Sequence, residues 1–320
     1  MASVPNFFIV GAPKCGTTSL ARYLAEHPSI FMCDLKEPSY FARELIECRT
    51  DSARRETPWR YEQAEYLKLF DAAQPVHVAV GEASTTYLYS HCAAPAIRAL
   101  APAARIIVML RDPVDLVQAL HAQKLLEGEE TVHSFEMAWR LQTQRKAGQG
   151  FARQPLRPQM LLYGEVGCIG AQLQRWLAVF PRSQVKVVLY DDFAAEPLRV
   201  YRDVLTFLGV HDDGREDFPV HNQNRRVTNS WIHRLATSKF GSVLAPYRFL
   251  RRQFGLNVGA TLRKHLLDAS SSTGGRAAIS PVLRRELREY FDSDLRLLED
   301  LLGRSLAAWR KGDSTTAEAR

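Results

Sequence analysis

Short apolar runs alternate along this chain with stretches in which apolar residues recur every three or four positions. The runs at 7–10, 76–80, 105–110 and 185–190 are too short for helices, so they predict buried strands. The run at 105–110 is apolar after its first residue, which is typical of a strand covered on both faces in a parallel sheet. The helical pattern predicts helices near 19–24, 63–70, 134–146, 169–180, 197–209 and 281–302.

This alternation predicts an α/β fold with a central, mainly parallel sheet flanked by helices. The chain has 320 residues, enough to bury one large core. We expect a single domain over residues 1–310, followed by a disordered tail at 311–320. A turn at Asp191 and Asp192 is expected to end the last of the four predicted strands.

A glycine-rich segment follows the first predicted strand. Gly11 and Gly16 let the backbone turn sharply, so that successive N–H groups and the start of the next helix face an anion. Lys14 adds a positive charge, and hydroxyl donors occupy positions 17–19. The lysine precedes the second glycine, whereas Gly-Lys-Ser/Thr closes the common nucleotide loop. The pattern predicts a phosphate loop; the alternative is an ordinary strand-to-helix turn with a solvated lysine.

A second anion-binding candidate follows the strand predicted at 105–110. Asp112 is a good helix N-cap and Pro113 a good first helical residue, so a helix is expected to start there. Arg111 then lies beside a helix N-terminus at the edge of the sheet where ligands bind in open α/β folds. The alternative is a structural arginine in a surface ion pair.

Two further loops carry charged residues. Pro38 biases Glu37 toward extended geometry, so the pair formed by Lys36 and Glu37 is expected to be presented on a loop. The segment 270–276 contains Gly275 and Arg276 and is interpreted either as a flexible linker or as a lid whose arginine grips a phosphate.

Composition narrows the range of partners. The net charge of +7 favours an anionic partner, and much of the excess positive charge lies between residues 222 and 267. No apolar run approaches the twenty or so residues of a membrane span, and no basic and apolar leader precedes the first strand, so we expect a cytoplasmic protein. The five cysteines have no paired spacing and no metal-ligand cluster is evident; the thiol of Cys15 is expected to be a small filler.

Three motifs in order give the chain a resemblance to PAPS-dependent sulfotransferases (PAPS is 3′-phosphoadenosine 5′-phosphosulfate). They are Pro13-Lys14-Cys15-Gly16-Thr17-Thr18-Ser19, Lys36-Glu37-Pro38-Ser39-Tyr40-Phe41 and Arg111-Asp112-Pro113-Val114. The chain most resembles bacterial members and heparan sulfate sulfotransferase domains, over almost all of its length. The resemblance implies a P-loop-like sulfotransferase fold.

The resemblance also implies roles for individual residues. Arg111 would bind the 3′-phosphate of PAPS, Tyr190 would lie near the adenine, and the loop with Gly275 and Arg276 would close over the cofactor. Glu37 would take the proton of an acceptor hydroxyl while Lys14 stabilises the leaving oxygen, without a metal. The residues implied to hold the 5′-phosphosulfate are Lys14, Cys15, Gly16, Thr17, Thr18 and Ser19.

The sequence departs from the family pattern at two positions. Ala119 stands where the family usually has a serine that donates to the 3′-phosphate, and Gln118 or Gln123 is a candidate to compensate. Ala83 stands where the related Glu-Lys-Thr-Pro segment has a lysine, and we hypothesise that Lys36 restores that charge and contacts the substrate.

Two other functions fit parts of the sequence. A nucleotide-dependent phosphotransferase of the kinase type shares the strand-loop-helix cradle, but no apolar strand ends in a convincing magnesium-holding aspartate. A basic nucleic-acid binder would use residues 222–267, which lack a recognised stacking module, so no nucleic-acid partner is expected. Within that stretch, 231–264 is also a candidate membrane-surface contact or a solvated helical face.

Overall fold

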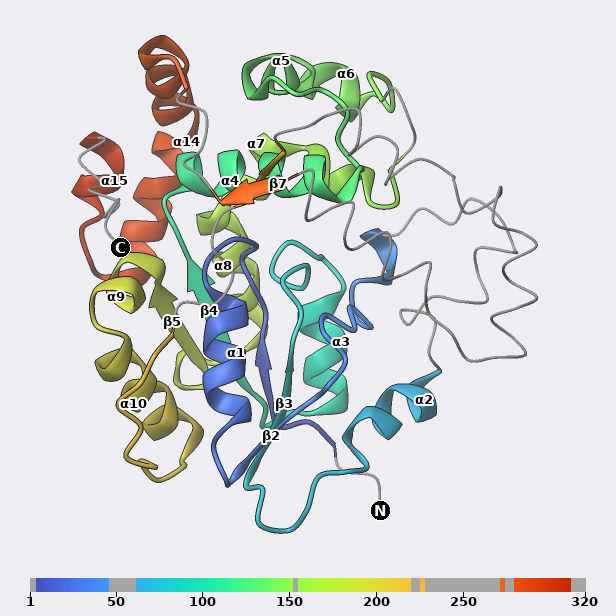
Figure 1. Ribbon diagram of the computed structural model, residues 1–320, viewed down its shortest axis with the longest axis vertical. Coiled ribbons are helices and arrows are strands. Elements are labelled where there is room, and N and C mark those ends of the chain that lie inside the picture. The colour runs from blue at the N-terminus through green and yellow to red at the C-terminus, as the bar shows by residue number, and fades with distance from the viewer. Residues whose placement is uncertain are drawn as a thin grey trace.

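Five parallel strands form the central sheet of the computed structural model, in the order β2-β3-β1-β4-β5 (Figure 1). The structure describes residues 4–45, 62–151, 155–219, 225–227, 271–273 and 279–311. The sheet strands are β1 (Phe7–Ile9), β2 (Ile30–Met32), β3 (Ala79–Ala83), β4 (Arg105–Leu110) and β5 (Val185–Leu189). The prediction of an α/β fold with a mainly parallel sheet is confirmed.

Helices flank this sheet and connect its strands. In Figure 1, α1 crosses in front of the sheet, while α9 and α10 lie beside β5 at its edge. A separate antiparallel pair joins β6 (Arg225–Val227) to β7 (Ser271–Thr273). The α-helices are α1 (Thr17–Ala25), α2 (Gln63–Leu67), α3 (Ala93–Leu100), α4 (Pro113–Glu127), α5 (Phe135–Arg140), α6 (Gln142–Lys146), α7 (Tyr163–Gly167), α8 (Ile169–Val179), α9 (Tyr190–Ala195), α10 (Pro197–Leu208), α14 (Pro281–Leu302) and α15 (Ala307–Lys311).

The strand predicted at 76–80 is placed wrongly along the chain, because β3 spans Ala79–Ala83. Val76 and Val78 are 54% and 57% exposed, and the buried strand β3 begins only at Ala79. A turn in which the N–H of His77 donates to Gln74 fills the preceding positions. Because β3 begins three residues later than predicted, it includes Glu82. A pattern of apolar residues does not predict a buried carboxylate in a strand.

Three other local predictions need correction. The strand β2 was not predicted, because a run of three residues falls below the length that periodicity can detect. The helix predicted at 134–146 is two helices, since α5 ends at Arg140 and α6 begins at Gln142. The turn predicted at Asp191 and Asp192 is the first turn of α9, where these carboxylates favour a helix N-terminus.

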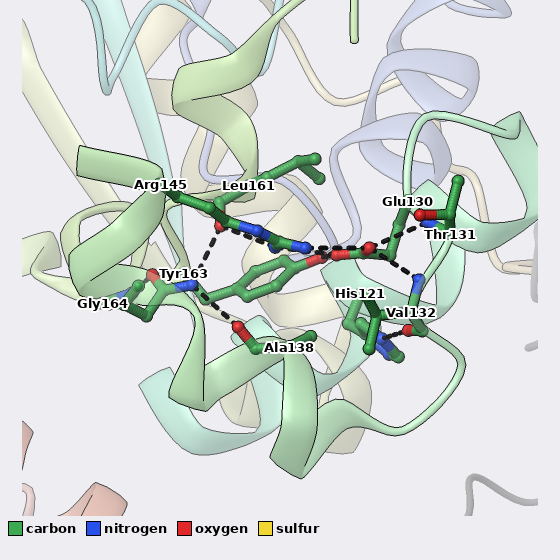
Figure 2. A network of polar contacts seen from close by, with 10 residues as sticks. His121, Glu130, Thr131, Val132, Ala138, Arg145, Leu161, Tyr163 and Gly164 are labelled. Carbon is green, nitrogen blue, oxygen red and sulfur yellow. Dashed lines mark hydrogen bonds and ion pairs between the residues drawn. The ribbon is translucent and has the colours of Figure 1, made fainter. Parts of the chain in front are cut away.

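A buried ion pair ties the segment after α4 to helix α6 (Figure 2). Glu130 receives hydrogen bonds from Arg145 and from the hydroxyl of Tyr163, and its ion pair with Arg145 spans 2.8 Å. Both charged side chains are only 1% exposed. Burial alone would raise the pKa of Glu130, but these donors, with the N–H of Val132, hold it below its usual value. Arg145 also donates to the backbone of Leu161, so two chain segments are fixed to each other.

We predict that Glu130→Ala lowers the free energy of unfolding by about 3–5 kcal/mol, because it leaves the buried Arg145 without its counter-charge. Urea unfolding followed by circular dichroism measures this. Glu289→Ala is the matched control, since its pair with Arg285 spans 3.7 Å between side chains that are 73% and 77% exposed. Equal unfolding midpoints for the two variants would show that the pair in Figure 2 does not anchor the fold.

Candidate functional site

The loop between β1 and α1 has the backbone geometry of an anion cradle. Gly11 has φ +133° and Gly16 has φ +84°, and a Cβ added to Gly11 would lie 2.6 Å from the backbone oxygen of Thr85. Lys14 between them also has a positive φ, of 63°. Helix α1 begins at Thr17 with no side chain capping its N-terminus and no acidic residue in its first turn. The first N–H groups of the helix are therefore not capped by a side chain or offset by a carboxylate.

Arg111 lies against this loop from the end of β4. Its Nη1 donates to the backbone oxygen of Lys14 at 3.4 Å, and its Nη2 lies 3.4 Å from Asp115. The residue is only 5% exposed, and its Nε is buried without a hydrogen bond. A buried guanidinium with two long contacts and one unsatisfied donor is suited to an anion. The ion pair with Asp115 exists, but it is not at the surface.

The helix predicted after Arg111 starts where expected. Asp112 accepts a hydrogen bond from the N–H of Val114 at 2.9 Å, and Pro113 is the first helical residue of α4. A second arginine, Arg288 of α14, reaches Asp112 at 2.7 Å. Arg111 is thus held at a capped helix N-terminus, as the sequence predicted.

Tyr190 lies next to both Arg111 and the loop after β1. The guanidinium of Arg111 lies 4.4 Å from the centroid of the Tyr190 ring, within cation–π range. A Cβ added to Gly16 would approach the rings of Phe193 and Tyr190 at 3.2–3.3 Å. Helix α9 therefore packs directly against the loop. Gly16, Arg111 and Tyr190, which are distant in sequence, meet at one edge of the sheet.

Cys15 is the small filler that the sequence predicted. It is fully buried, and burial raises the pKa of its thiol to about 12. Its Sγ donates to the backbone oxygen of Pro13 at 3.4 Å. A thiol held protonated in this way is not a nucleophile at neutral pH.

Glu37 stands on a loop, as predicted, but its backbone is not extended. Its φ is 52°, and that of Ser39 is 53°. The preference imposed by Pro38 is overcome by hydrogen bonds to the chain after β3: Thr85 Oγ1 donates to Glu37 Oε2 at 3.1 Å, and the N–H of Ser39 donates to Ser84 Oγ at 3.0 Å. Among the described residues, no ion pair joins Glu37 to Lys36.

A cavity of about 220 Å³ opens beside Glu37. It is bounded by the loop after β1, by the loop carrying Lys36, by the segment after β3, by α4 and by the segment after residue 155. Gln123 lines it and donates to Glu127 at 2.6 Å, while Ala119 is buried. The lining residues are Pro13, Lys36, Glu37, Thr85, Thr86, Leu120, Gln123, Lys124, Glu127, Glu129, Leu156, Arg157 and Met160.

Glu82 is a buried carboxyl that the sequence reading did not single out. It is completely buried in β3 and accepts hydrogen bonds from Tyr66 at 2.9 Å, Tyr87 at 2.7 Å and Ser84 at 2.6 Å. Burial raises its pKa to about 7 even though these hydroxyls act in the opposite direction. The sequence does show a single carboxylate followed closely by several hydroxyl residues, which could have indicated a hydrogen-bonded carboxyl. It was overlooked because the strand was predicted to end at residue 80.

Several predicted residues lie outside the described parts of the chain. Gly275, Arg276 and the basic segment 231–264 are among them. No group of histidine, cysteine or acidic side chains in the described ranges has the arrangement of a metal site. None of the helices that the structure describes is long and apolar enough to cross a membrane.

Comparison with known proteins gives consistent similarities. A family model described as "Sulfotransferase family" matches residues 5–214. The chain is 27% identical over 251 residues to Carbohydrate sulfotransferase 15 of Homo sapiens, a match that covers 65% of this chain and 44% of that protein. It is 26% identical over 213 residues to Bifunctional heparan sulfate N-deacetylase/N-sulfotransferase 3 of Homo sapiens, covering 65% of this chain and 22% of that protein. The chain thus spans less than half the length of these curated relatives.

A solved structure is similar over nearly the whole chain. The crystal structure of a sulfotransferase from Alicyclobacillus acidocaldarius has a TM-score of 0.70 and 31% sequence identity, and the match covers 96% of this chain and 99% of that one. The similarity therefore extends well beyond the residues that the family model matches.

We predict that Glu82 makes stability fall with rising pH. Its pKa is about 7 in the folded chain against an ordinary 4.5, so between these values the folded state binds more protons than the unfolded state. The free energy of unfolding therefore decreases as pH rises through this window. In Glu82→Gln this part of the decrease should be absent, as measured by urea unfolding at a series of pH values. The exposed control Glu289→Gln should follow the wild type; a Glu82→Gln profile that does so too contradicts the assignment.

Proposed function

The chain belongs to the sulfotransferase family, and from this premise we propose that it transfers a sulfuryl group from PAPS to an acceptor hydroxyl. The observation that supports this donor best is the contact between Arg111 and the loop at Lys14, with a buried Nε on Arg111 left unsatisfied. PAPS carries a 5′-phosphosulfate and a 3′-phosphate, so it needs two separated anion sites. The loop suits the first group and Arg111 the second.

The residues around the loop fit the donor's two ends. The uncapped start of α1, with the hydroxyls of Thr17, Thr18 and Ser19, offers donors to the 5′-phosphosulfate. The cation–π contact between Arg111 and Tyr190 supplies a ring beside the 3′-phosphate site, consistent with a place near the adenine. Ala119 contributes no hydroxyl there, so Arg111 carries more of the recognition than in relatives with a serine.

The proposed chemistry assigns Lys14 and Glu37 to opposite ends of the transfer. When bound, PAPS supplies an activated sulfuryl group. Lys14 stabilises negative charge on the departing nucleotide oxygen. Glu37 lines the cavity with its Oε2 fixed by Thr85, and it receives the proton of the attacking hydroxyl. General-base catalysis of this kind contributes about 10²–10⁴ in rate.

The acceptor is proposed to be a hydroxyl compound such as a carbohydrate, because a relative is named as a carbohydrate sulfotransferase. An N-sulfotransferase among the relatives makes an amine the second choice. The cavity combines aliphatic side chains, such as Leu120 and Met160, with charged ones. Such a lining suits a hydroxyl compound with an apolar face. Transfer from radiolabelled PAPS to a panel of glycans, lipids and phenols identifies the acceptor.

Calorimetry tests the donor directly. Adenosine 3′,5′-bisphosphate, the nucleotide product, should bind without added metal. If this nucleotide does not bind while ATP with magnesium binds tightly, the chain is a phosphotransferase instead. The proposed cytoplasmic location and the membrane contact through 231–264 stay predictions from the sequence.

We predict that Lys14→Ala and Glu37→Gln each abolish sulfuryl transfer while the protein stays folded. Only Lys14→Ala should greatly weaken binding of adenosine 3′,5′-bisphosphate, because Glu37 faces the acceptor cavity. Radiolabel transfer and calorimetry on both variants measure the two effects. Equal losses of nucleotide affinity would remove Glu37 from the role of base.

We further predict that Lys36→Ala slows transfer with little change in nucleotide binding, because Lys36 lines the cavity and stands in for the lysine replaced by Ala83. Steady-state kinetics with PAPS and the identified acceptor measures this. Lys68→Ala, on the 3₁₀ turn after α2, is the control. Unchanged kinetics in Lys36→Ala would refute the hypothesis that Lys36 supplies the charge missing at Ala83.

A further inference from the structure

Helix α9 lies between the proposed donor site and the C-terminal part of the chain. One side of the helix presents Tyr190 to Arg111, and Tyr190 and Phe193 to Gly16. The helix has only six residues, too few to be stable by itself. Its position must therefore be set by what packs around it.

The other side of α9 is held by two side chains from the end of the chain. Trp309 is 2% exposed, and its indole Nε1 donates to Asp191 Oδ2 at 2.6 Å. Arg304 binds both carboxylate oxygens of Asp192, and this contact lowers the pKa of that aspartate. We call Arg304 and Trp309 the C-terminal brace. Figure 1 shows α15, which carries Trp309, next to α9.

The brace is itself fixed to the long helix α14. Arg310 of α15 lies 3.0 Å from Asp292, and the N–H of Leu306 donates to Glu299 at 2.5 Å. Helix α14 packs in turn against α8, where Asp294 accepts from the N–H of Gly170 at 2.7 Å. Through these contacts the brace fixes α9 to the body of the domain. It lies outside residues 5–214, the part that the family model matches.

We propose that the C-terminal brace positions Tyr190 under Arg111 and thereby determines the preference for nucleotides with a 3′-phosphate. The inference rests on the proposed function, in which Arg111 binds that phosphate. Hydrogen bonds to a carboxylate are stronger and shorter than neutral ones, so losing the one from Trp309 frees the first turn of α9. Tyr190 is the first residue of that turn, and the guanidinium of Arg111 lies over the face of its ring.

The test compares two nucleotides in the full-length chain. Adenosine 3′,5′-bisphosphate reports the 3′-phosphate contact, and adenosine 5′-monophosphate lacks it. In Trp309→Phe the dissociation constant of the bisphosphate should rise about tenfold, the equivalent of about 1.4 kcal/mol, while that of the monophosphate should rise by a smaller factor, since it lacks the contact with Arg111. Calorimetry measures all four constants. A role in folding alone would weaken the binding of both nucleotides by the same factor, or of neither.

Trp139→Phe is the matched control. Trp139 is also a buried indole, but its Nε1 donates to Glu286 at 3.0 Å and its ring packs on Tyr290 and Phe291, all on α14. It should leave the ratio of the two constants unchanged. If Trp309→Phe fails to fold, Arg304→Gln replaces it: that side chain is 54% exposed, and among the described residues it forms an ion pair with Asp192. A smaller change of the ratio in the same direction is then expected.

The outcomes separate this inference from the proposed function. A wild-type chain that does not prefer the bisphosphate overturns both. A wild-type preference that persists undiminished in Trp309→Phe, or in Arg304→Gln where that variant is used, overturns the role of the brace alone. An equal loss of both nucleotides also overturns it, because the effect would then not pass through Arg111.

Discussion

The close approach of the loop after β1 to its neighbours is the constraint on which the rest of the site depends. A Cβ at Gly11 would lie 2.6 Å from a backbone oxygen, and one at Gly16 would press on two aromatic rings. Because side chains are excluded there, the backbone of the loop packs directly against Thr85 and α9, which fixes the loop that we propose holds an anion. Arg111 lies within 3.4 Å of the Lys14 backbone, so the two proposed anion-binding features are in contact.

Burying the guanidinium of Arg111 at this edge has an energetic cost that an anion bound as proposed would offset. Arg111 is 5% exposed, and its described polar contacts to Asp115 and Lys14 are both 3.4 Å long. The pair of Glu130 and Arg145 shows the contrasting case, in which a buried guanidinium is matched by one carboxylate at 2.8 Å. In the second arrangement the charge is matched within the protein, although Arg145 Nε is also buried without a hydrogen bond, and the pair fixes the fold. In the first, both polar contacts are long, so an anionic ligand bound as proposed would add shorter hydrogen bonds.

The parts of this fold that follow from local sequence could be predicted, and those set by tertiary contacts could not. Strand β4 and helix α14 have long, regular patterns and lie where the sequence placed them. Arg111 and the loop were found because glycine, lysine and N-cap signals act locally. Glu82 was missed because its burial depends on where β3 pairs with β1, and the left-handed backbone of Glu37 was missed because hydrogen bonds from residues 84 and 85 impose it.

Backbone strain ties the two proposed catalytic residues to the framework. Among the residues that the structure describes, the non-glycine residues with positive φ are Lys14, Glu37 and Ser39. Each such conformation costs about 1–2 kcal/mol, so it persists only where the surroundings impose it. Ser84 links this strain to the core, because its hydroxyl accepts from the N–H of Ser39 and donates to the buried Glu82. The carboxyl inside the sheet therefore helps to hold the loop that presents Glu37 to the cavity, although it does not face the cavity itself.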